Sequence, residues 1–183
     1  GGFDQTLLLI DGVKMDDPQT GHHTMNAALP LEVIERIEII KGPAARVFGQ
    51  NAFTGAINII TKKSLNNSVS LNMEAGSFGQ LNGSVTAGVD KENSSHIIHV
   101  GRVTSEGYRN NSDYDNANYF LKSTFNKNAQ PIILTASFLE RNFGAENFYT
   151  TNPTFNEYEE TQNSLLALST TFKKNNLKIQ PRL

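Results

Sequence analysis

The feature that most constrains this chain is a two-residue alternation of polar and apolar side chains from about residue 68 onward. A period of two places alternate side chains on opposite faces of a β-sheet. Each run is about ten residues long, the length that a tilted strand needs to cross a bilayer, whereas strands of ordinary globular proteins have about five or six. The clearest apolar positions are Val69, Leu71, Met73 and Ala75, then Leu81, Val85, Ala87 and Val89, then Tyr119, Leu121 and Phe125.

The connections between the runs give a second signal. Three further runs, over 94–103, 131–140 and 163–173, alternate less cleanly. Two connections are long, 104–117 and 141–161, and in an up-and-down meander they share one end of the sheet. Short turns at one end and long loops at the other are typical of outer-membrane β-barrels. A soluble β-sandwich or meander with irregular loops is the alternative.

Composition narrows the class of protein. The 183 residues carry a formal net charge of -2 and only 19% are charged, which argues against a nucleic-acid partner. The absence of Cys excludes disulfides and thiolate metal sites. No apolar run approaches the roughly 20 residues of a transmembrane helix, and the mean hydropathy of -0.38 is compatible with barrel strands. No GxSxG, P-loop or HExxH motif is present, so we expect no enzyme.

Residues 1–63 follow a different pattern and predict a small α+β unit. Pro30 suits the start of a short helical turn over 31–35, and 44–48 is at most a short helix. The predicted strands are the apolar run 7–10, closed by Asp11-Gly12, the alternating run 36–41, and the β-branched run 56–61.

Four segments of this first part carry a family resemblance. They are 7–12 (LLLIDG), 17–23 (DPQTGHH), 34–49 (IERIEIIKGPAARVFG) and 51–63 (NAFTGAINIITKK). In this order they resemble the plug domain of TonB-dependent outer-membrane receptors. The DPQTGHH loop and 143–149 (FGAENFY) are similar to receptors for vitamin B12 or siderophores. One departure is Lys41, where the family usually has Arg before Gly-Pro.

The resemblance implies a fold, a location and a set of partners. The fold is a partial α+β plug domain (1–63), a linker (64–67) and an incomplete antiparallel transmembrane β-barrel (68–183), with six to seven strands of a presumed 22. We expect a fragment of an outer-membrane receptor of a Gram-negative bacterium that takes up cobalamin or an iron-siderophore. Its partners would be outer-membrane lipid, the nutrient ligand and TonB, which would act through a segment missing from this chain.

The resemblance also implies site residues. Charged residues at positions matching Arg36, Glu38 and Lys41 would engage the barrel wall and hold the plug, whereas the simpler interpretation is a solvated charged face. The loop that contains His22 and His23 would lie near a plug apex facing the ligand, although a solvated loop is the alternative. Ligand contacts are therefore assigned to Gln19, Thr20, His22, His23, Phe148 and Tyr149.

Two loops remain open to interpretation. No cofactor is required, but Glu106, Asp113 and Asp115 are candidate calcium ligands in an Asn/Asp-rich loop that lacks the EF-hand pattern. The aromatic residues of 141–161 suit either a ligand grip or the interfacial girdle of a barrel. They are Phe143, Phe148, Tyr149, Phe155 and Tyr158, and they accompany Glu157, Glu159 and Glu160.

The alternative function from another class is a β-rich surface binding or adhesion protein without energy coupling. The two hypotheses predict different structures. The receptor requires a small mixed sheet from 7–63 against the polar face of the long strands, and an open, curved meander with both long loops at one end. A closed sandwich with its apolar faces buried inside would contradict the membrane interpretation.

Overall fold

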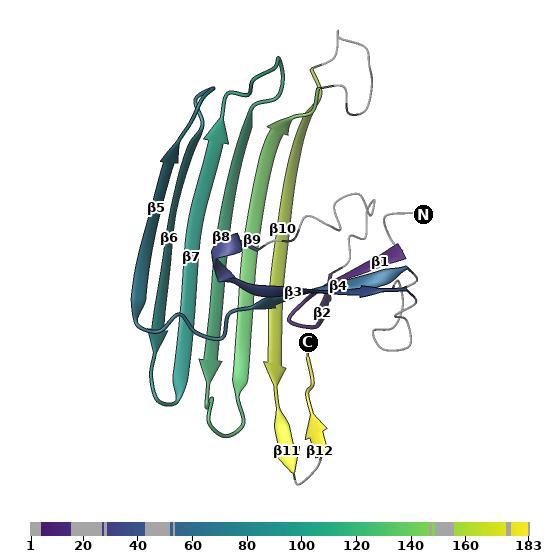
Figure 1. Ribbon diagram of the computed structural model, residues 1–183, viewed down its shortest axis with the longest axis vertical. Helices are drawn as coiled ribbons and strands as arrows, with labels where there is room; N and C mark the ends of the chain where they lie inside the picture. The colour runs from purple at the N-terminus through teal and green to yellow at the C-terminus, as the bar shows by residue number, and fades with distance from the viewer. Residues whose placement is uncertain are drawn as a thin grey trace. The chain divides into compact units, whose positions relative to one another are not determined.

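The computed structural model (Figure 1) describes residues 5–15, 27, 29–42, 52, 54–146, 148, 156–174 and 177–182. The chain forms two compact units, one mainly from residues 1–63 and the other mainly from residues 64–181. Among the residues described, no helix has the length and apolar character needed to cross a membrane.

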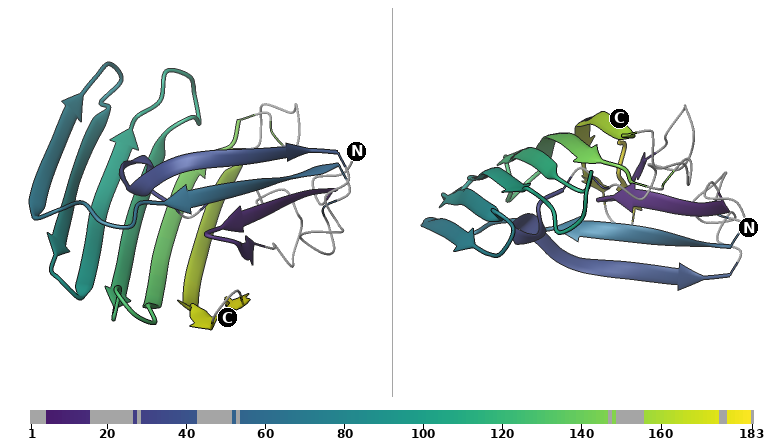
Figure 2. Two further views of the ribbon diagram at one scale, coloured as in Figure 1. Left: turned by 60° about the horizontal axis from the view of Figure 1, so that its bottom comes forward. Right: turned by 90° about the horizontal axis from the view of Figure 1, so that it is seen from above.

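The first unit is built around a four-stranded mixed sheet (Figure 2). A 3-10 turn, η2 (Leu31–Val33), leads into β3, as expected after Pro30. The central strands β1 and β4 pair in parallel, and the outer strands β2 and β3 are antiparallel to them in the order β2-β1-β4-β3. The strands are β1 (Thr6–Ile10), β2 (Val13–Met15), β3 (Ile34–Lys41) and β4 (Gly55–Thr61).

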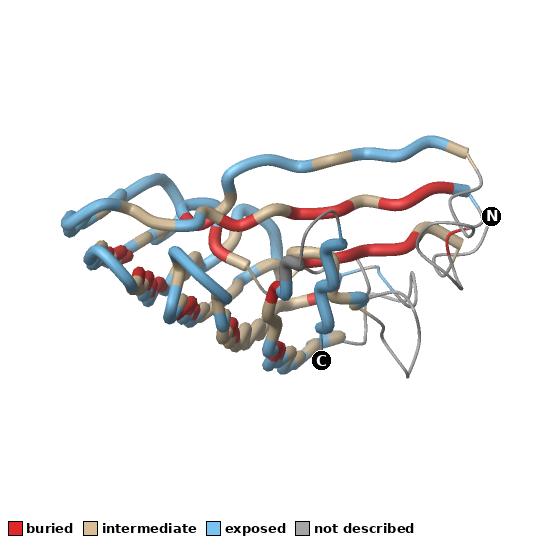
Figure 3. Tube along the Cα trace, turned by 90° about the horizontal axis from the view of Figure 1, so that it is seen from below, coloured by how far each residue is buried: buried red, intermediate tan, exposed pale blue. Residues whose placement is uncertain are grey.

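Burial follows position in this sheet. The apolar run Leu7 to Ile10 is buried, and Leu7 and Leu9 form a core cluster with Ala52 and Ala56. Strand β4 is also mostly buried, whereas the edge strand β3 is largely exposed (Figure 3). A continuous apolar run in a central parallel strand and alternating charge in an edge strand are the patterns that these environments favour.

The second unit is a six-stranded antiparallel meander in the order β10-β9-β8-β7-β6-β5 (Figure 1). The connections after β5, β7 and β9 share one end of the sheet, and the short turns after β6 and β8 share the other. A separate two-stranded ribbon, β11 (Phe172–Lys174) with β12 (Leu177–Ile179), follows β10. The long strands are β5 (Ser68–Ala75), β6 (Leu81–Asp90), β7 (Ser94–Ser105), β8 (Tyr114–Phe125), β9 (Ile132–Gly144) and β10 (Tyr158–Thr170).

Both loops predicted to be long are shorter than expected. The ladder between β7 and β8 continues to the pair Ser105–Tyr114, and that between β9 and β10 continues to Gly144–Tyr158. Backbone pairing does not require apolar side chains, so the strands extend beyond the alternating runs. Phe143, Tyr158, Glu159 and Glu160 therefore belong to strands and were wrongly assigned to a loop. The short strands β2 and β11 were not predicted.

The two faces of the six-stranded sheet differ in an unusual way. One face, named here the apolar face, carries Val69, Leu71 and Leu166 with exposed fractions of 76%, 68% and 74%. The backbone register places Ala87, Ile98 and Leu121 in the same cross-strand row as Val69. The opposite face is the buried one. Its buried apolar residues are Ile97, Phe120, Leu165 and Ala167, and they are outnumbered by buried polar ones: Ser84, Thr86, Ser95, His99, Lys122, Thr135 and Ser137. The closed soluble sandwich, which would bury the apolar face, is not observed.

Candidate functional site

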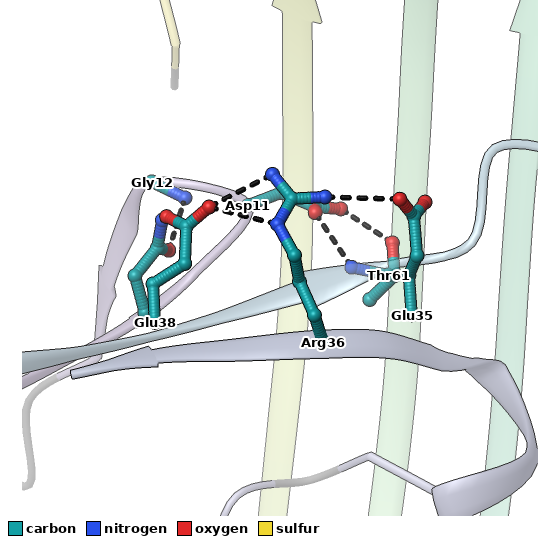
Figure 4. Close-up of polar contacts among 7 residues, drawn as sticks. Asp11, Gly12, Glu35, Arg36, Glu38 and Thr61 are labelled. Atoms are coloured by element: carbon teal, nitrogen blue, oxygen red, sulfur yellow. Dashed lines mark hydrogen bonds and ion pairs between the residues drawn. The ribbon is translucent and has the colours of Figure 1, made fainter.

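The first candidate site is a polar network on the four-stranded sheet, and it begins at the β1–β2 turn. Asp11 and Gly12 both have positive φ, 50° and 78°, as a two-residue hairpin turn requires. The Asp11 carboxylate accepts hydrogen bonds from the Thr61 backbone N at 2.9 Å and from Thr61 Oγ1 at 2.6 Å. These bonds fix the turn to the end of β4 (Figure 4).

Asn58 links this turn to the edge strand. Its Oδ1 accepts from the Gly12 backbone N at 3.0 Å, and its Nδ2 donates to Glu38 Oε2 at 3.1 Å. Asn58 is directly opposite Glu38 in the β3–β4 register and is only 9% exposed. Both ends of a nearly buried amide are therefore satisfied, as a stable interior position requires.

Arg36 completes the network on β3. Its Nε donates to Glu38 Oε1 at 2.9 Å, and its Nη1 donates to Glu35 Oε1 at 2.9 Å (Figure 4). The register shifts between Ile34 and Arg36. Such a bulge re-aims side chains, which explains how adjacent residues Glu35 and Arg36 reach each other.

The ion pairs shift the ionisation of this group. The hydrogen bond from Arg36, followed by that from Asn58, lowers the pKa of the Glu38 carboxyl below its usual value. In turn, the hydrogen bond to Glu38 raises the pKa of Arg36, with smaller charge effects from Glu38 and Glu35. Arg36 and Glu38 therefore stay charged near neutral pH.

The structure brings together two of the three predicted plug–wall residues. Arg36 and Glu38 are in contact, whereas the two-residue period places Lys41 on the other face of β3, opposite Gly55. Sequence reasoning missed Glu35, Asp11, Asn58 and Thr61. Asn58 had a readable signal, because it is the one polar residue in the otherwise apolar run 56–60.

The predicted ligand residues fall largely outside the described part of the chain. Gln19, Thr20, His22, His23 and Tyr149 all lie outside it, as does the predicted short helix over 44–48. Phe148 is described: the residue is 62% exposed, and its backbone N donates to the Ala145 carbonyl at 3.0 Å.

The three candidate calcium ligands are not gathered into one site. The Asp115 carboxylate accepts two hydrogen bonds from the Arg102 guanidinium on β7. The backbone of Glu106 bonds instead to Phe78 of the β5–β6 connection, and that of Asp113 bonds to Gly144. No group of three or more His, Asp or Glu within the described ranges could hold a metal ion. The calcium assignment therefore has no support in this geometry.

Comparison with known proteins agrees with this fold. Residues 1–56 match the family model of the TonB-dependent receptor plug domain. The chain is 40% identical over 68 residues to the iron-regulated outer membrane virulence protein of Vibrio cholerae, which covers 34% of this chain and 10% of that protein. It is 32% identical over 107 residues to the vitamin B12 transporter BtuB of Vibrio cholerae, which covers 57% of this chain and 17% of that protein.

A solved structure extends the likeness to both units. The siderophore receptor PiuA of Acinetobacter baumannii matches with a TM-score of 0.74 and 15% identity, over 98% of this chain and 28% of that one. The match to the plug-domain model covers residues 1–56, and the solved structure shows that the fold of the whole chain is similar to part of a siderophore receptor. The chain spans only a small part of the relatives it matches, 10% and 17% of the two curated proteins. The names of two of these proteins, a vitamin B12 transporter and a siderophore receptor, agree with the expectation that the protein is not an enzyme.

Proposed function

We propose that this chain is part of an outer-membrane receptor in which β5–β10 form one section of a membrane-spanning barrel wall. The observation that carries the proposal is the exposed apolar face of the six-stranded sheet, opposite a face whose buried side chains are mostly polar. This distribution is the reverse of a soluble sandwich, whose apolar side chains pack inward. It is the distribution of a wall that meets lipid outside and a polar lumen inside.

The height of the apolar face supports a bilayer. On β8 the ten steps from Asp115 to Phe125 cover about 34 Å at roughly 3.4 Å each. At a tilt of about 45° this corresponds to about 24 Å along the membrane normal, close to the roughly 25 Å apolar band of outer-membrane barrels. Charged residues mark the limit of this stretch at the loop end. Arg102 on β7 pairs with Asp115 on β8, and Glu140 lies on the adjacent strand β9.

Two aromatic pairs lie on the apolar face, one near the middle of this stretch and one at its turn-end limit. Near the middle of the stretch, the rings of Tyr119 and Phe138 are 6.2 Å apart on neighbouring strands. Towards the turn end, the rings of His96 and Phe125 are 5.3 Å apart in an edge-on arrangement. The pair at the turn end suits the aromatic girdle that barrels place at the lipid headgroups. We assign the loop end to the cell exterior, because the longer connections, after β7 and β9, lie there and outer-membrane barrels have their longer loops outside.

For the whole receptor, we propose active uptake of a cobalamin or an iron-siderophore, with TonB supplying the energy. Residues 1–63 would form the plug, 64–67 the linker and 68–183 the start of the barrel. Arg36, Glu38 and Lys41 would contact the wall, and the internally satisfied network around Asn58 would keep the plug sheet intact while it is moved. The loop residues Gln19, Thr20, His22, His23, Phe148 and Tyr149 remain the proposed ligand contacts. The names of the relatives, a vitamin B12 transporter and an iron-regulated outer membrane protein, support this choice of nutrient.

The test is uptake by the full-length receptor in a bacterial strain that lacks its own cobalamin and siderophore receptors. Radiolabelled cyanocobalamin and several ferric siderophores are supplied to cells with and without TonB. We expect TonB-dependent accumulation of one of these ligands. Surface binding of a ligand without TonB-dependent accumulation would instead support the adhesion or binding protein.

A further inference from the structure

The linker that precedes β5 is fastened to the six-stranded sheet. Residues 64–67 belong to the same compact unit as this sheet. The chain at Leu65 and Asn66 crosses directly over Gly88 on β6, where an added Cβ would lie 2.5 Å from Leu65 Cβ and 3.0 Å from the Asn66 carbonyl oxygen. Glycine is the residue that allows such a close approach of one backbone to another. A side chain at this position would therefore push the linker off the strand.

The path of the chain between the linker and β5 is fixed by local bonds. The ladder between β5 and β6 begins at Ser68. Just before it, Asn66 has a φ of 53°, in the left-handed region that Asn tolerates better than most residues, so the chain changes direction there. Asn67 Oδ1 accepts a hydrogen bond from the Asp90 backbone N at 2.9 Å, and Ser68 Oγ donates to the Leu65 carbonyl at 2.6 Å. The Asn67 side chain thereby takes the place of a backbone acceptor at the end of the ladder.

Asp90 also joins the linker to the neighbouring turn of the sheet. Its carboxylate pairs with Lys127 Nζ at 2.5 Å, and the two side chains are only 26% and 27% exposed. Partly buried pairs are screened by salt much less than fully exposed ones. The Lys127 backbone N donates to the Asn93 carbonyl at 3.2 Å, and Asn128 Nδ2 donates to the Glu92 carbonyl at 2.7 Å. The linker, the end of β6 and the turns after β6 and β8 therefore form one connected group, named here the linker anchor. Its central members are Leu65, Asn67, Gly88, Asp90 and Lys127.

The position of the anchor decides where a pull on the first part of the chain ends. Within the described sheet, β5 pairs with β6 alone, over Ser68–Ala75. A pull that reached Ser68 would draw β5 along β6 against the hydrogen bonds of this ladder. Residues 65–67 come before Ser68, so a pull from the N-terminal side reaches the anchor first. The anchor passes the force to β6 through Gly88 and Asp90, and through Lys127 to the turn between β8 and β9.

We propose that the linker anchor is a mechanical stop, at which force applied to the plug ends before it reaches β5. The plug could then be moved while the first strand of the barrel wall keeps its register. The bond from Asp90 N to Asn67 and the Asp90–Lys127 pair hold the linker in place, and Gly88 provides the space in which it lies. The proposal rests on the proposed function in one respect, namely that the plug is pulled. The anchor itself can be tested without ligand and without TonB.

The experiment is single-molecule pulling of the full-length receptor in a supported bilayer, with the chain held at its N-terminal end. We expect a distinct force peak when the chain is extended as far as residue 64, before β5 leaves the sheet. In Asn67→Ala this peak is lost, and the first peak from the barrel lies about 10 Å further along, the length of three residues at about 3.4 Å each. The matched control is Asn82→Ala on the same hairpin, whose side chain makes only a 3.4 Å contact with Glu74 at the loop end. This control keeps the peak at residue 64.

The outcomes separate the anchor from the function of the receptor. Absence of a peak at residue 64 in the wild-type receptor, or the same peak in Asn67→Ala, overturns the proposed stop. If Asn67→Ala does not fold, Lys127→Met answers the same question, because it leaves the linker and the β5–β6 ladder unchanged and should lower the force of this peak. A receptor that shows the peak but no TonB-dependent uptake would contradict the proposed function and leave the anchor standing. An active receptor without the peak would contradict the anchor alone.

Discussion

Substitution of Leu121 by Arg separates a lipid-facing surface from a water-facing one. Leu121 is 37% exposed and lies near the middle of the β8 stretch, in a row with Ile98 and Ala136. An arginine on the lipid face of a barrel costs about 2–4 kcal/mol at the bilayer midplane. At an ordinary water-exposed position the same change is usually within about 0.5 kcal/mol. The receptor hypothesis therefore predicts a roughly 30- to 1,000-fold rise in the unfolding equilibrium constant.

The assay is reversible unfolding of the full-length receptor in lipid vesicles by guanidinium chloride. The folded fraction is followed by the faster migration of intact barrels in unheated gels. Thr104→Arg is the matched control, because Thr104 lies on the same face in the row of Asp115 at the loop-side limit. We expect a cost of about 0–1 kcal/mol there, as for interface positions. Equal, negligible effects of the two substitutions would show that the apolar face meets water and would refute the reasoning.

Three further predictions concern the first unit, each measured as the free energy of unfolding of the full-length receptor. Thr61→Val should cost about 1–3 kcal/mol, because it removes the hydroxyl that donates to the Asp11 carboxylate at a position 1% exposed; an unchanged stability would contradict the role of this bond. Gly55→Ala should cost about 1–3 kcal/mol, because a Cβ there would collide with the Ile40 carbonyl oxygen, whereas Gly83→Ala, with open space around it, should be nearly neutral. Since Arg36 lowers the pKa of Glu38 below the usual 4.5, the pair stabilises the fold above about pH 4.5, and this contribution is lost as the pH falls through the lowered pKa. Glu38→Gln should remove that part of the acid sensitivity, and an identical acid titration for the variant would show that the pair contributes nothing.

Much of the fold was accessible from local sequence. The run 7–10, the alternating run 36–41 and the run 56–61 predicted β1, β3 and β4, because continuous apolar character and strict alternation have few other structural solutions. The long strands and the face on which Val69 and Leu121 lie followed from the period of two. The ends of the strands could not be predicted in this way. The polar residues that continue β7 and β8 are held by backbone pairing, which leaves no signal in the hydropathy of the sequence.

Only part of the polar network around Asn58 could be predicted from the sequence. Arg36 and Glu38 are two apart on one strand and so predictably share a face, but their link to Asn58 depends on the β3–β4 register, which a single strand does not encode. The contact between Glu35 and Arg36 depends on a bulge, which alternation would have ruled out. The three carboxylates near residue 110 illustrate the reverse error. Their closeness in sequence suggested a metal site, whereas pairing across the sheet gives Asp115 to Arg102 instead.

The most direct test of the central claim is a spin-label scan along β8 from Asn116 to Phe125 in the full-length receptor in lipid vesicles. The accessibility of each label to oxygen, which concentrates in lipid, is compared with its accessibility to a water-soluble nickel complex. The account predicts a period of two, with high oxygen accessibility at the odd positions such as Tyr119 and Leu121 and low accessibility at Asn118 and Phe120. Accessibility to the nickel complex at the odd positions, or no alternation at all, would contradict a membrane-spanning wall.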